Sequence, residues 1–263
     1  MEIHDFFALV NSKILKDVPI ALTIGVFDGV HRGHEDIFNK VKEYALTHPG
    51  TKTMVITFSQ NPKIKGQMFV DTLRLREEYI SSFGINYFTL IDFCEEISKI
   101  SGNEFIRLLC TMCRVKAVVV GEDFKCGTPN SQVTAKELEK EFESTGNSVD
   151  VFIRETIMDD QVRISSTLLR QMIQKGDLDG VKRLSGRPYV IDLVEKAIID
   201  NKSLTFATSS INQVLPPFGT YKALLKLKSG NSIACKVTID ESKLMIDKNE
   251  KDVESLSIIT KEL

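Results

Sequence analysis

The sequence predicts an α/β protein in which a parallel sheet covered by helices is followed by a small antiparallel, β-barrel-like domain. Apolar, strand-like runs alternate with helical patterns up to about residue 186, and short β-rich runs separated by turns replace them from residue 187 onward. The chain of 263 residues exceeds one typical domain, and its hydrophobic content of 42% is sufficient for two cores. We therefore expect domains over residues 1–186 and 187–263.

The first strand and helix enclose the most informative segment of the chain. Residues 19–24 read as a buried strand, and apolar residues recur at helical spacing over residues 37–45. Between them lies the run Gly25-Val26-Phe27-Asp28-Gly29-Val30-His31-Arg32-Gly33-His34. A helix N-terminus favours anions through its unpaired N–H groups and its dipole, and glycines allow the backbone to approach a ligand. The segment is therefore predicted to hold phosphates.

Two other interpretations of this segment are open at this point. A strand, a glycine turn and a helix are common to all α/β proteins, so the turn can be purely structural. A His-x-x-His pair can also ligate a metal, but a zinc site needs further ligands, and the remaining histidines are His4 and His48, with no cysteine near the motif. We expect no metal held by protein ligands alone.

The remaining elements of the first domain follow the same alternation. Strands are expected over residues 54–58, 87–93, 117–120 and 149–156, and a helix over residues 72–83 ends at a glycine. Ser101 with Glu104, and Thr134 with Glu137, have capping-box spacing and predict two more helix starts. In a parallel sheet, ligands bind at the carboxyl ends of the strands, where the histidine segment and the loop of residues 121–127 are both expected to emerge.

The C-terminal part has a different pattern. Strands are expected over residues 204–207, 220–227, 233–239, 243–246 and 256–260, with a turn at Lys228-Ser229-Gly230-Asn231. Closely spaced strands of this kind predict a small antiparallel barrel.

Four segments in order resemble one known family. The run Gly25–His34 is similar to the signature of the prokaryotic FAD synthetases, which are bifunctional riboflavin kinase/FMN adenylyltransferases of the His-x-Gly-His nucleotidylyltransferase superfamily. Three later segments resemble the family's second motif, its third motif and the junction of its two modules, and they read Val119-Val120-Gly121-Glu122-Asp123-Phe124-Lys125-Cys126-Gly127, Arg163-Ile164-Ser165-Ser166-Thr167-Leu168-Leu169-Arg170 and Gly186-Arg187-Pro188-Tyr189. The resemblance implies a Rossmann-like nucleotidylyltransferase domain that transfers AMP from Mg·ATP to FMN, giving FAD and pyrophosphate.

The third motif has a physical basis of its own. Ser165, Ser166 and Thr167 precede an apolar helical pattern, so they should lie at a helix N-terminus, where serines are usually only caps. Arg163 and Arg170 flank them and supply two permanent cations that suit a triphosphate.

Catalysis of this transfer consists mainly of positioning and charge stabilisation. We expect catalytic contacts from His31, His34, Ser166 and Arg170. By analogy with the family, the expected ligand-binding residues are Gly25, Phe27, Asp28, Gly29, Gly33, Asp123, Arg163, Ser165 and Thr167, and for the flavin Phe58, Asn61, Pro62 and Phe124.

The flavin region departs from the family. Its members usually carry an Asp-Pro-His-Pro run or a similar one after the second strand, whereas this chain reads Phe58-Ser59-Gln60-Asn61-Pro62. Ser59 stands where the aspartate is usual and Gln60 where the first proline is usual. A phenylalanine at a strand end is also more often part of the core than a ligand contact.

The C-terminal domain corresponds by position to the riboflavin kinase module but is shorter and lacks its motifs. No glycine occurs between Tyr189 and Lys202, and the Gly-Phe-Pro-Thr-Ala-Asn motif aligns best with Thr205-Phe206-Ala207-Thr208-Ser209-Ser210. Leu215-Pro216-Pro217-Phe218-Gly219-Thr220-Tyr221 still resembles the family's Leu-Pro-x-Gly-Val-Tyr turn. Backbone N–H groups that wrap phosphates need permissive torsions, so we expect a degenerate kinase retained for structure or interaction.

Composition restricts partners and location. The net charge is −2 with scattered basic residues, so no nucleic acid or membrane surface is expected as a partner, and protein partners are not predicted. The N-terminal residues lack a signal-peptide pattern, and five cysteines without a disulfide framework fit a reducing compartment, so a cytoplasmic location is expected. Cys110 and Cys113 have redox spacing but lie within a helical pattern, which favours buried thiols.

Three rival functions remain open. The chain can be fully bifunctional, it can transfer a nucleotide to another phosphate ester, or it can be a regulator that binds flavin or nucleotide without turnover. The intact motifs favour a monofunctional FMN adenylyltransferase over the regulator.

Overall fold

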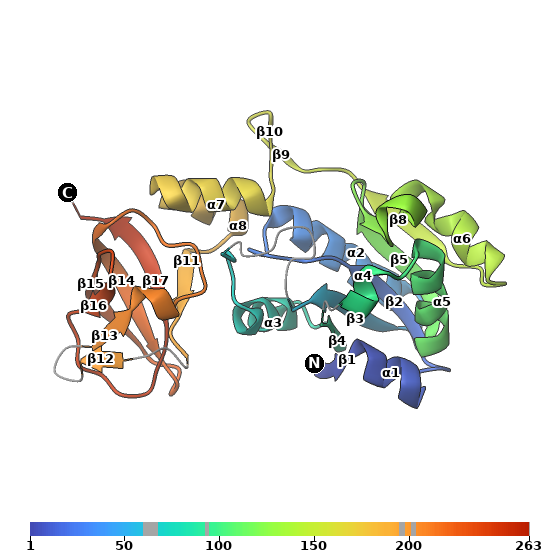
Figure 1. The fold of residues 1–263 in the computed structure, drawn as a ribbon, viewed down its shortest axis with the longest axis horizontal. Helices are drawn as coiled ribbons and strands as arrows, with labels where there is room; N and C mark the ends of the chain where they lie inside the picture. Colours follow the sequence, from blue (N-terminus) through green and yellow to red (C-terminus); the bar gives the residue numbers. More distant parts are fainter. Residues whose placement is uncertain (60–67, 93–94, 195–197, 201–203, 263) are drawn as a thin grey trace. The chain divides into compact units, whose positions relative to one another are not determined.

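A computed structural model describes the chain except for residues 60–67, 93–94, 195–197, 201–203 and 263. The chain forms two compact units (Figure 1). The first unit comprises Met1–Phe27, Gly33–Gln67 and Glu77–Ile157, and the second comprises Asp28–Arg32, Met68–Arg76 and Met158–Leu263. The functional boundary expected between residues 186 and 187 remains a prediction.

The first unit is built on a parallel sheet of six strands in the order β1-β4-β3-β2-β5-β8. This confirms the predicted α/β class. The strands are β1 (Glu2–Asp5), β2 (Pro19–Ile24), β3 (Lys52–Phe58), β4 (Tyr87–Ile91), β5 (Arg114–Gly121) and β8 (Asp150–Arg154), and a small antiparallel pair is formed by β6 (Lys125–Cys126) and β7 (Val133–Thr134). The helices are α1 (Phe6–Ser12), α2 (Arg32–Thr47), α3 (Leu73–Ser82), α4 (Glu95–Ser98), α5 (Gly102–Met112) and α6 (Leu138–Ser144), with short 3-10 turns at Pro129–Ser131 and Ala135–Glu137. The first residue of α2 and residues 73–76 of α3 are assigned to the second unit.

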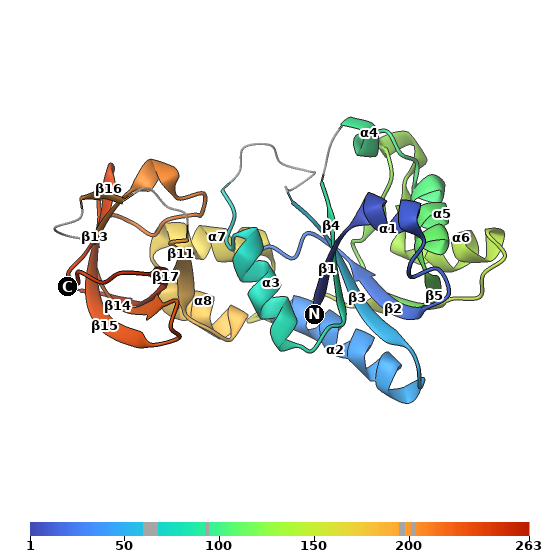
Figure 2. The ribbon, with the colours of Figure 1, turned by 90° about the horizontal axis from the view of Figure 1, so that it is seen from below.

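Helices cover both faces of this sheet (Figures 1 and 2). Alternate residues of β2, Ile20, Leu22 and Ile24, share one core with α1, α5 and α6. On the other face, α2 buries Phe38 and Val41 completely. Burial on two faces explains why the central strands read as nearly continuous apolar runs.

The predicted strand and helix positions are largely confirmed. Strand β2 has the expected bounds, and both capping boxes are present, Ser101 with Glu104 before α5 and Thr134 with Glu137 before the turn that leads into α6. The pairing of β1 with the edge of the sheet, and helix α1, were not predicted, because the polar residues of this segment mask its short apolar pattern. Asp5 caps α1 through a bond of 2.7 Å from the Ala8 N–H.

Strand order places the predicted motifs at a switch point of the sheet. The chain passes from β2 through β3 to β4 and then returns to the other side of β2 with β5. Between β2 and β5 the direction of winding reverses, and open α/β sheets bind ligands outside the carboxyl ends of such neighbouring strands. The histidine segment follows β2 and the second motif follows β5.

The second unit contains an antiparallel sheet of seven strands, which curls in Figures 1 and 2 and confirms the barrel-like prediction. Its order is β11-β17-β14-β15-β16-β13-β12. The strands are β11 (Tyr189–Asp192), β12 (Ile198–Asp200), β13 (Leu204–Ala207), β14 (Gly219–Leu227), β15 (Ser232–Ile239), β16 (Lys243–Ile246) and β17 (Val253–Lys261), preceded by the hairpin β9 (Met158–Asp159) and β10 (Val162–Arg163) and by helices α7 (Ser166–Lys175) and α8 (Leu178–Ser185), and a 3-10 turn lies at Thr208–Ser210.

The predicted turn between β14 and β15 is present. Gly230 has a φ of +87°, which the left-handed turn position requires and which glycine adopts without strain. The five strands expected from the sequence all occur, whereas β11 and β12 were not predicted. None of the helices in the described residues has both the length and the apolar character needed to cross a bilayer.

Candidate functional site

In the first unit, the carboxyl edge of the sheet brings the first two motifs to neighbouring strands. β2 ends at Ile24, and the Gly25 N–H continues the sheet by donating to the Ile56 carbonyl at 3.0 Å. β5 ends at Gly121, whose carbonyl accepts from the Phe124 N–H at 3.0 Å in a tight turn. The exposed Asp123 lies in this turn, so its carboxylate is accessible at the edge where a ligand is expected.

Phe27 holds an unusual backbone conformation at this edge. Its φ is +50°, in the left-handed region that non-glycine residues rarely adopt, and its side chain is only 3% exposed. The ring lies 5.2 Å from that of His34, edge to face, and 5.0 Å from that of Phe38. The ligand contact expected for Phe27 stays a prediction, and the structure places its ring against those of His34 and Phe38, both on α2.

Gly25 is required by the same arrangement. A Cβ atom at this position would lie 2.7 Å from the Phe27 ring, closer than real side chains approach. The glycine therefore makes room for the ring that supports His34.

In the second unit, segment 28–32 is tied to α7. The Ser166 hydroxyl donates to the Asp28 carbonyl at 2.7 Å, and the Arg170 guanidinium donates to the Asp28 carboxylate at 2.8 Å. Arg170 also donates through Nε to the Met68 carbonyl at 3.1 Å. Two residues for which the sequence predicts phosphate contact thus hold segment 28–32 through Asp28.

Asp28 is the centre of this arrangement. Its side chain is buried, and its Oδ1 accepts from the N–H groups of Val70 and Asp71 at 2.9 and 3.0 Å. Burial raises the pKa of Asp28, opposed by these bonds and by the charges of Arg170 and Arg76. The expected ligand contact of Asp28 remains a prediction; its described contacts are to protein groups.

His31 immediately precedes α2 and is 5% exposed. Burial lowers its pKa to about 4; its own backbone opposes the shift, and the charges of Arg187 and Arg163 add to it. The imidazole is therefore neutral at pH 7 and can donate one hydrogen bond without carrying a charge.

The structure also describes the other predicted residues of the first and third motifs. Gly29, with a φ of +63°, would place a Cβ 2.7 Å from Val70, so only glycine fits there. Gly33 lies in the first turn of α2. Ser165 is the N-cap of α7 and accepts from the Leu168 N–H at 3.2 Å, while Arg163 and Thr167 are exposed near its start.

The predicted flavin residues are only partly described. Phe58 and Phe124 are half-buried and pack against the same core cluster of the first unit. Asn61 and Pro62 lie outside the described residues. Ser59 donates from its hydroxyl to Asp92 at 2.6 Å, a contact at the end of β3 that the sequence did not predict.

Three charged residues of the second unit were not predicted as site residues: Asp71 and Arg76, which are buried, and Arg187, which is half-buried. Asp71, Arg76 and Arg187 surround segment 28–32, and Arg187 donates to the Asp71 carboxylate at 2.7 Å. Asp71 lies outside every motif, in the run Phe69-Val70-Asp71-Thr72-Leu73, and a single carboxylate within such a run is not by itself marked as buried. Arg187 belongs to the junction motif Gly186-Arg187-Pro188-Tyr189, and this position is the sequence signal that could have marked it.

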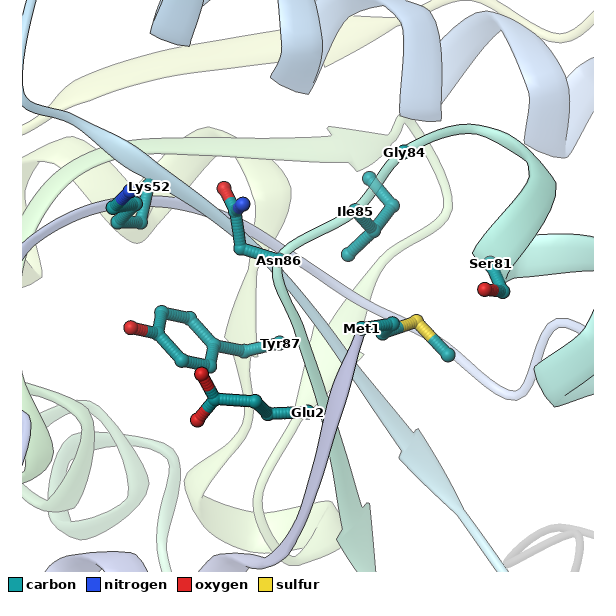
Figure 3. A pocket seen from close by; sticks show the side chains of 8 residues that line it. All are labelled: Met1, Glu2, Lys52, Ser81, Gly84, Ile85, Asn86 and Tyr87. Carbon is teal, nitrogen blue, oxygen red and sulfur yellow. The ribbon is translucent and has the colours of Figure 1, made fainter.

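A separate hollow of about 340 Å³ lies at the opposite edge of the first unit's sheet, and its lining includes Lys52, Asn86 and Tyr87 (Figure 3). These residues stand at or just before the amino ends of β3 and β4, so the hollow is separate from the motifs at the carboxyl edge. Within the described ranges, no three His, Cys, Asp or Glu side chains converge in a way that could hold a metal ion.

Comparison with known proteins gives the family. A "FAD synthetase" protein from Listeria monocytogenes is 29% identical over 210 residues, which cover 76% of this chain and 79% of that protein. Proteins named "Bifunctional riboflavin kinase/FMN adenylyltransferase" are 26% identical in L. monocytogenes and 30% identical in Escherichia coli K12, over 78% and 76% of this chain and 67% and 66% of their own lengths. Another from Buchnera aphidicola matches over 56% of its own length.

A solved structure has the same fold along nearly the whole chain. It is described as a macrolide-efflux protein from Streptococcus pneumoniae, and it superposes with a TM-score of 0.77 at 19% identity over 95% of this chain and 91% of its own. At this identity the likeness concerns the fold alone. The family model of FAD synthetase matches residues 14–168, more than half of the chain, and the protein therefore belongs to the FAD synthetase family.

Proposed function

We propose that this protein transfers the AMP group of ATP to FMN and releases pyrophosphate, forming FAD. Family membership gives the reaction class. The observation that carries the assignment to this site is the position of the histidine segment, which follows β2 at the switch point of the sheet and leads directly into the N-terminus of α2.

In the proposed reaction, a phosphate oxygen of FMN attacks the α-phosphorus of ATP. One P–O bond forms to the flavin nucleotide as the bond between the α-phosphorus and the bridging oxygen breaks, and that oxygen leaves with pyrophosphate. No covalent enzyme intermediate is needed. Mg²⁺ enters as part of the Mg·ATP substrate and reduces the charge of the phosphates.

The chain's own residues would supply positioned donors. His31 is neutral at pH 7, so it would donate an N–H to a phosphate oxygen rather than contribute a full charge. The N–H groups of the first turn of α2 point toward the same end of the helix, and His34 lies within that turn. Arg163 and Thr167, exposed near the start of α7, are proposed to meet the triphosphate, and Asp123 and the Gly25–Gly29 backbone the adenosine.

The test is an assay of the purified full chain with ATP, Mg²⁺ and FMN, in which FAD is followed by chromatography and pyrophosphate by a coupled enzyme. We expect both products in equal amounts. Binding of FMN and ATP without pyrophosphate release would instead indicate a regulator. Turnover of another phosphate ester that FMN does not inhibit would indicate a different acceptor.

We also propose that the C-terminal domain has no kinase activity and that the protein acts in the cytoplasm on small molecules. The absence of glycine between Tyr189 and Lys202 supports the first statement. Free thiols at four cysteines of the described part, together with the composition, support the second statement, because disulfides are rare in a reducing compartment.

A further inference from the structure

Segment 28–32 is held by partners that are distant in the sequence but lie in the same compact unit. Its first carbonyl, that of Asp28, accepts from Ser166 at 2.7 Å. The Val30 carbonyl accepts from Arg187 Nη1 at 2.6 Å. The second bond lies on the peptide group that joins Val30 to His31, so it restricts the backbone at the histidine itself.

Arg187 is in turn fixed on two sides. Its Nη1 also donates to the Ser185 carbonyl at 3.1 Å, and its Nη2 donates to Asp71 at 2.7 Å. Gly186 ends α8 with a φ of +70°, and Arg187 follows it, two residues before the start of β11. The junction between the last helix and the C-terminal sheet therefore sets where this guanidinium lies.

Asp71 belongs to segment 68–76, which the C-terminal sheet holds in place. Gln213 donates from Nε2 to the carbonyls of Val70 and Val190 at 2.8 and 2.9 Å and accepts from the Asp192 N–H at 2.7 Å. Gln213 is 1% exposed, so these bonds form in a buried environment, where each is expensive to leave unmade.

A second set of bonds strengthens the same attachment. Arg74 meets the Asp192 carboxylate through Nε and Nη2 at 2.9 to 3.1 Å and Glu254 through Nη1 at 3.2 Å. The Thr72 hydroxyl donates to Asp192 at 2.6 Å. Segment 68–76 is thus attached to β11 and β17, and it presents the N–H groups of Val70 and Asp71 to the Asp28 carboxylate.

We propose that Arg187 is a positioning residue for His31, and that the C-terminal domain is retained because it fixes this residue and segment 68–76 against segment 28–32. The inference rests on the proposed function, because it gives the domain a role in the same transfer reaction. Arg187 acts through the backbone of His31 and through Asp71, not on the substrate. Displacements of about 1 Å at a reacting group can lower rates by about a hundredfold. Loss of the Arg187 hydrogen bonds should therefore lower the rate of the chemical step.

The experiment compares Arg187→Ala, Arg187→Lys and Arg183→Ala in the full chain. Arg183 is the matched control, because it lies four residues earlier on α8, is 55% exposed and pairs with Asp159. We expect Arg187→Ala to lower kcat for FAD formation about 10- to 100-fold while KM for ATP and FMN changes less than about threefold. Lysine reaches one partner at a time, so Arg187→Lys should recover part of the loss.

A second measurement is independent of turnover. The chain has only four histidines, so ¹⁵N-histidine NMR can resolve His31 after assignment with His31→Asn. Arg187→Ala and Arg187→Lys should shift the His31 signals, and Arg183→Ala should leave them in place. Wild-type kcat for Arg187→Lys together with unmoved His31 signals would overturn the proposal, even if Arg187→Ala failed to fold.

The two readouts separate this inference from the proposed function. If the wild type forms no FAD but the His31 signals respond to Arg187 variants alone, the positioning role stands and the proposed reaction fails. If the wild type forms FAD and neither readout responds to Arg187, the reaction stands and the positioning role fails.

Discussion

At the scale of single residues, His31 combines burial with a position at the start of a long helix. A buried neutral imidazole presents its donor without a hydration shell that would have to be removed, and preorganised donors of this kind stabilise charge that develops in the transition state. Phe27 supplies the corresponding support for His34, at the cost of a left-handed backbone conformation.

We predict that His31→Asn and His34→Ala each lower kcat for FAD formation by about a hundredfold, because each removes a donor to developing phosphate charge. The measurement is steady-state kinetics with FMN and ATP, together with circular dichroism to check folding. His48→Asn is the matched control, since His48 lies at the far end of α2 and stacks on Tyr44. Near-normal turnover in both site variants would remove the histidines from the mechanism.

The low pKa of His31 also predicts a pH dependence of stability. The pKa falls from an ordinary 6.5 to about 4 on folding, so between these values the unfolded chain binds more protons and acid favours unfolding. The contribution of neutral His31 to the stability of the folded state is present above pH 6.5 and is lost as the pH falls toward 4. Relative to His31→Asn, the wild type should lose about 2 kcal/mol between pH 7 and pH 5, measured by urea unfolding.

Asp71 provides a comparison of opposite sign. Burial raises its pKa from 3.8 to about 6, opposed by the charge of Arg187, so the folded chain binds the additional proton and acid favours folding. Relative to Asp71→Asn, the wild type should gain about 1 kcal/mol between pH 7 and pH 5. Parallel pH profiles for all three proteins would contradict both assignments.

At the scale of elements, α7 connects the third motif to the first. Arg170 is buried in the second turn of this helix and pairs with Asp28, while Ser165 caps its N-terminus. The sequence placed the serines and the arginine at a helix start, and the structure adds that both Ser166 and Arg170 hold segment 28–32. Removing one member of a buried ion pair leaves the other uncompensated.

We therefore predict that Arg170→Ala lowers the free energy of unfolding by about 3 kcal/mol and strongly reduces FAD formation. Arg170→Lys retains the charge but cannot reach both Asp28 and the Met68 carbonyl, so it should lie between the wild type and Arg170→Ala. Ser166→Ala should be milder. Lys175→Ala, an exposed change on the same helix, is the control, and wild-type stability and kinetics for Arg170→Ala would show that the pair is unimportant.

At the scale of the whole molecule, the C-terminal sheet of seven strands is fully formed, although its sequence departs from the kinase motifs expected by resemblance. Strand β14 pairs with β15 in one unbroken register, and it pairs with β17 with two local register shifts. Residues of this sheet and its loops, such as Asp192 and Gln213, are used to hold segment 68–76. The positioning role proposed above would explain why this sheet is retained without a second active site.

We predict that the full chain does not phosphorylate riboflavin. No glycine is available between Tyr189 and Lys202 to wrap phosphates, the aligned motif keeps threonine but not asparagine for a metal, and no placed carboxylate is recognised as a base. The assay supplies riboflavin, ATP and Mg²⁺ and follows FMN by chromatography, with conversion of FMN to FAD as the control. Accumulation of FMN or FAD from riboflavin would restore the bifunctional interpretation.

The sequence by itself determined the two-part architecture, the central strands and the place of the motifs. Nearly continuous apolar runs mark β2 and β5 because both are buried on two faces, and capping residues mark α5 and α7 because those signals are local. Edge strand β1 and short strands β11 and β12 escaped prediction, since their residues lack a pattern long enough to separate strand from loop.

Only the tertiary structure decided which charged side chains lie beside one another. Asp71 and Arg187 are 116 positions apart, and each resembles an ordinary surface residue until the fold places one beside the other. Burial then lowers the pKa of His31 and raises that of Asp71, because desolvation disfavours whichever form carries charge. Local sequence can specify a strand, a turn and a helix, but the environment of a charge depends on contacts made across the whole chain.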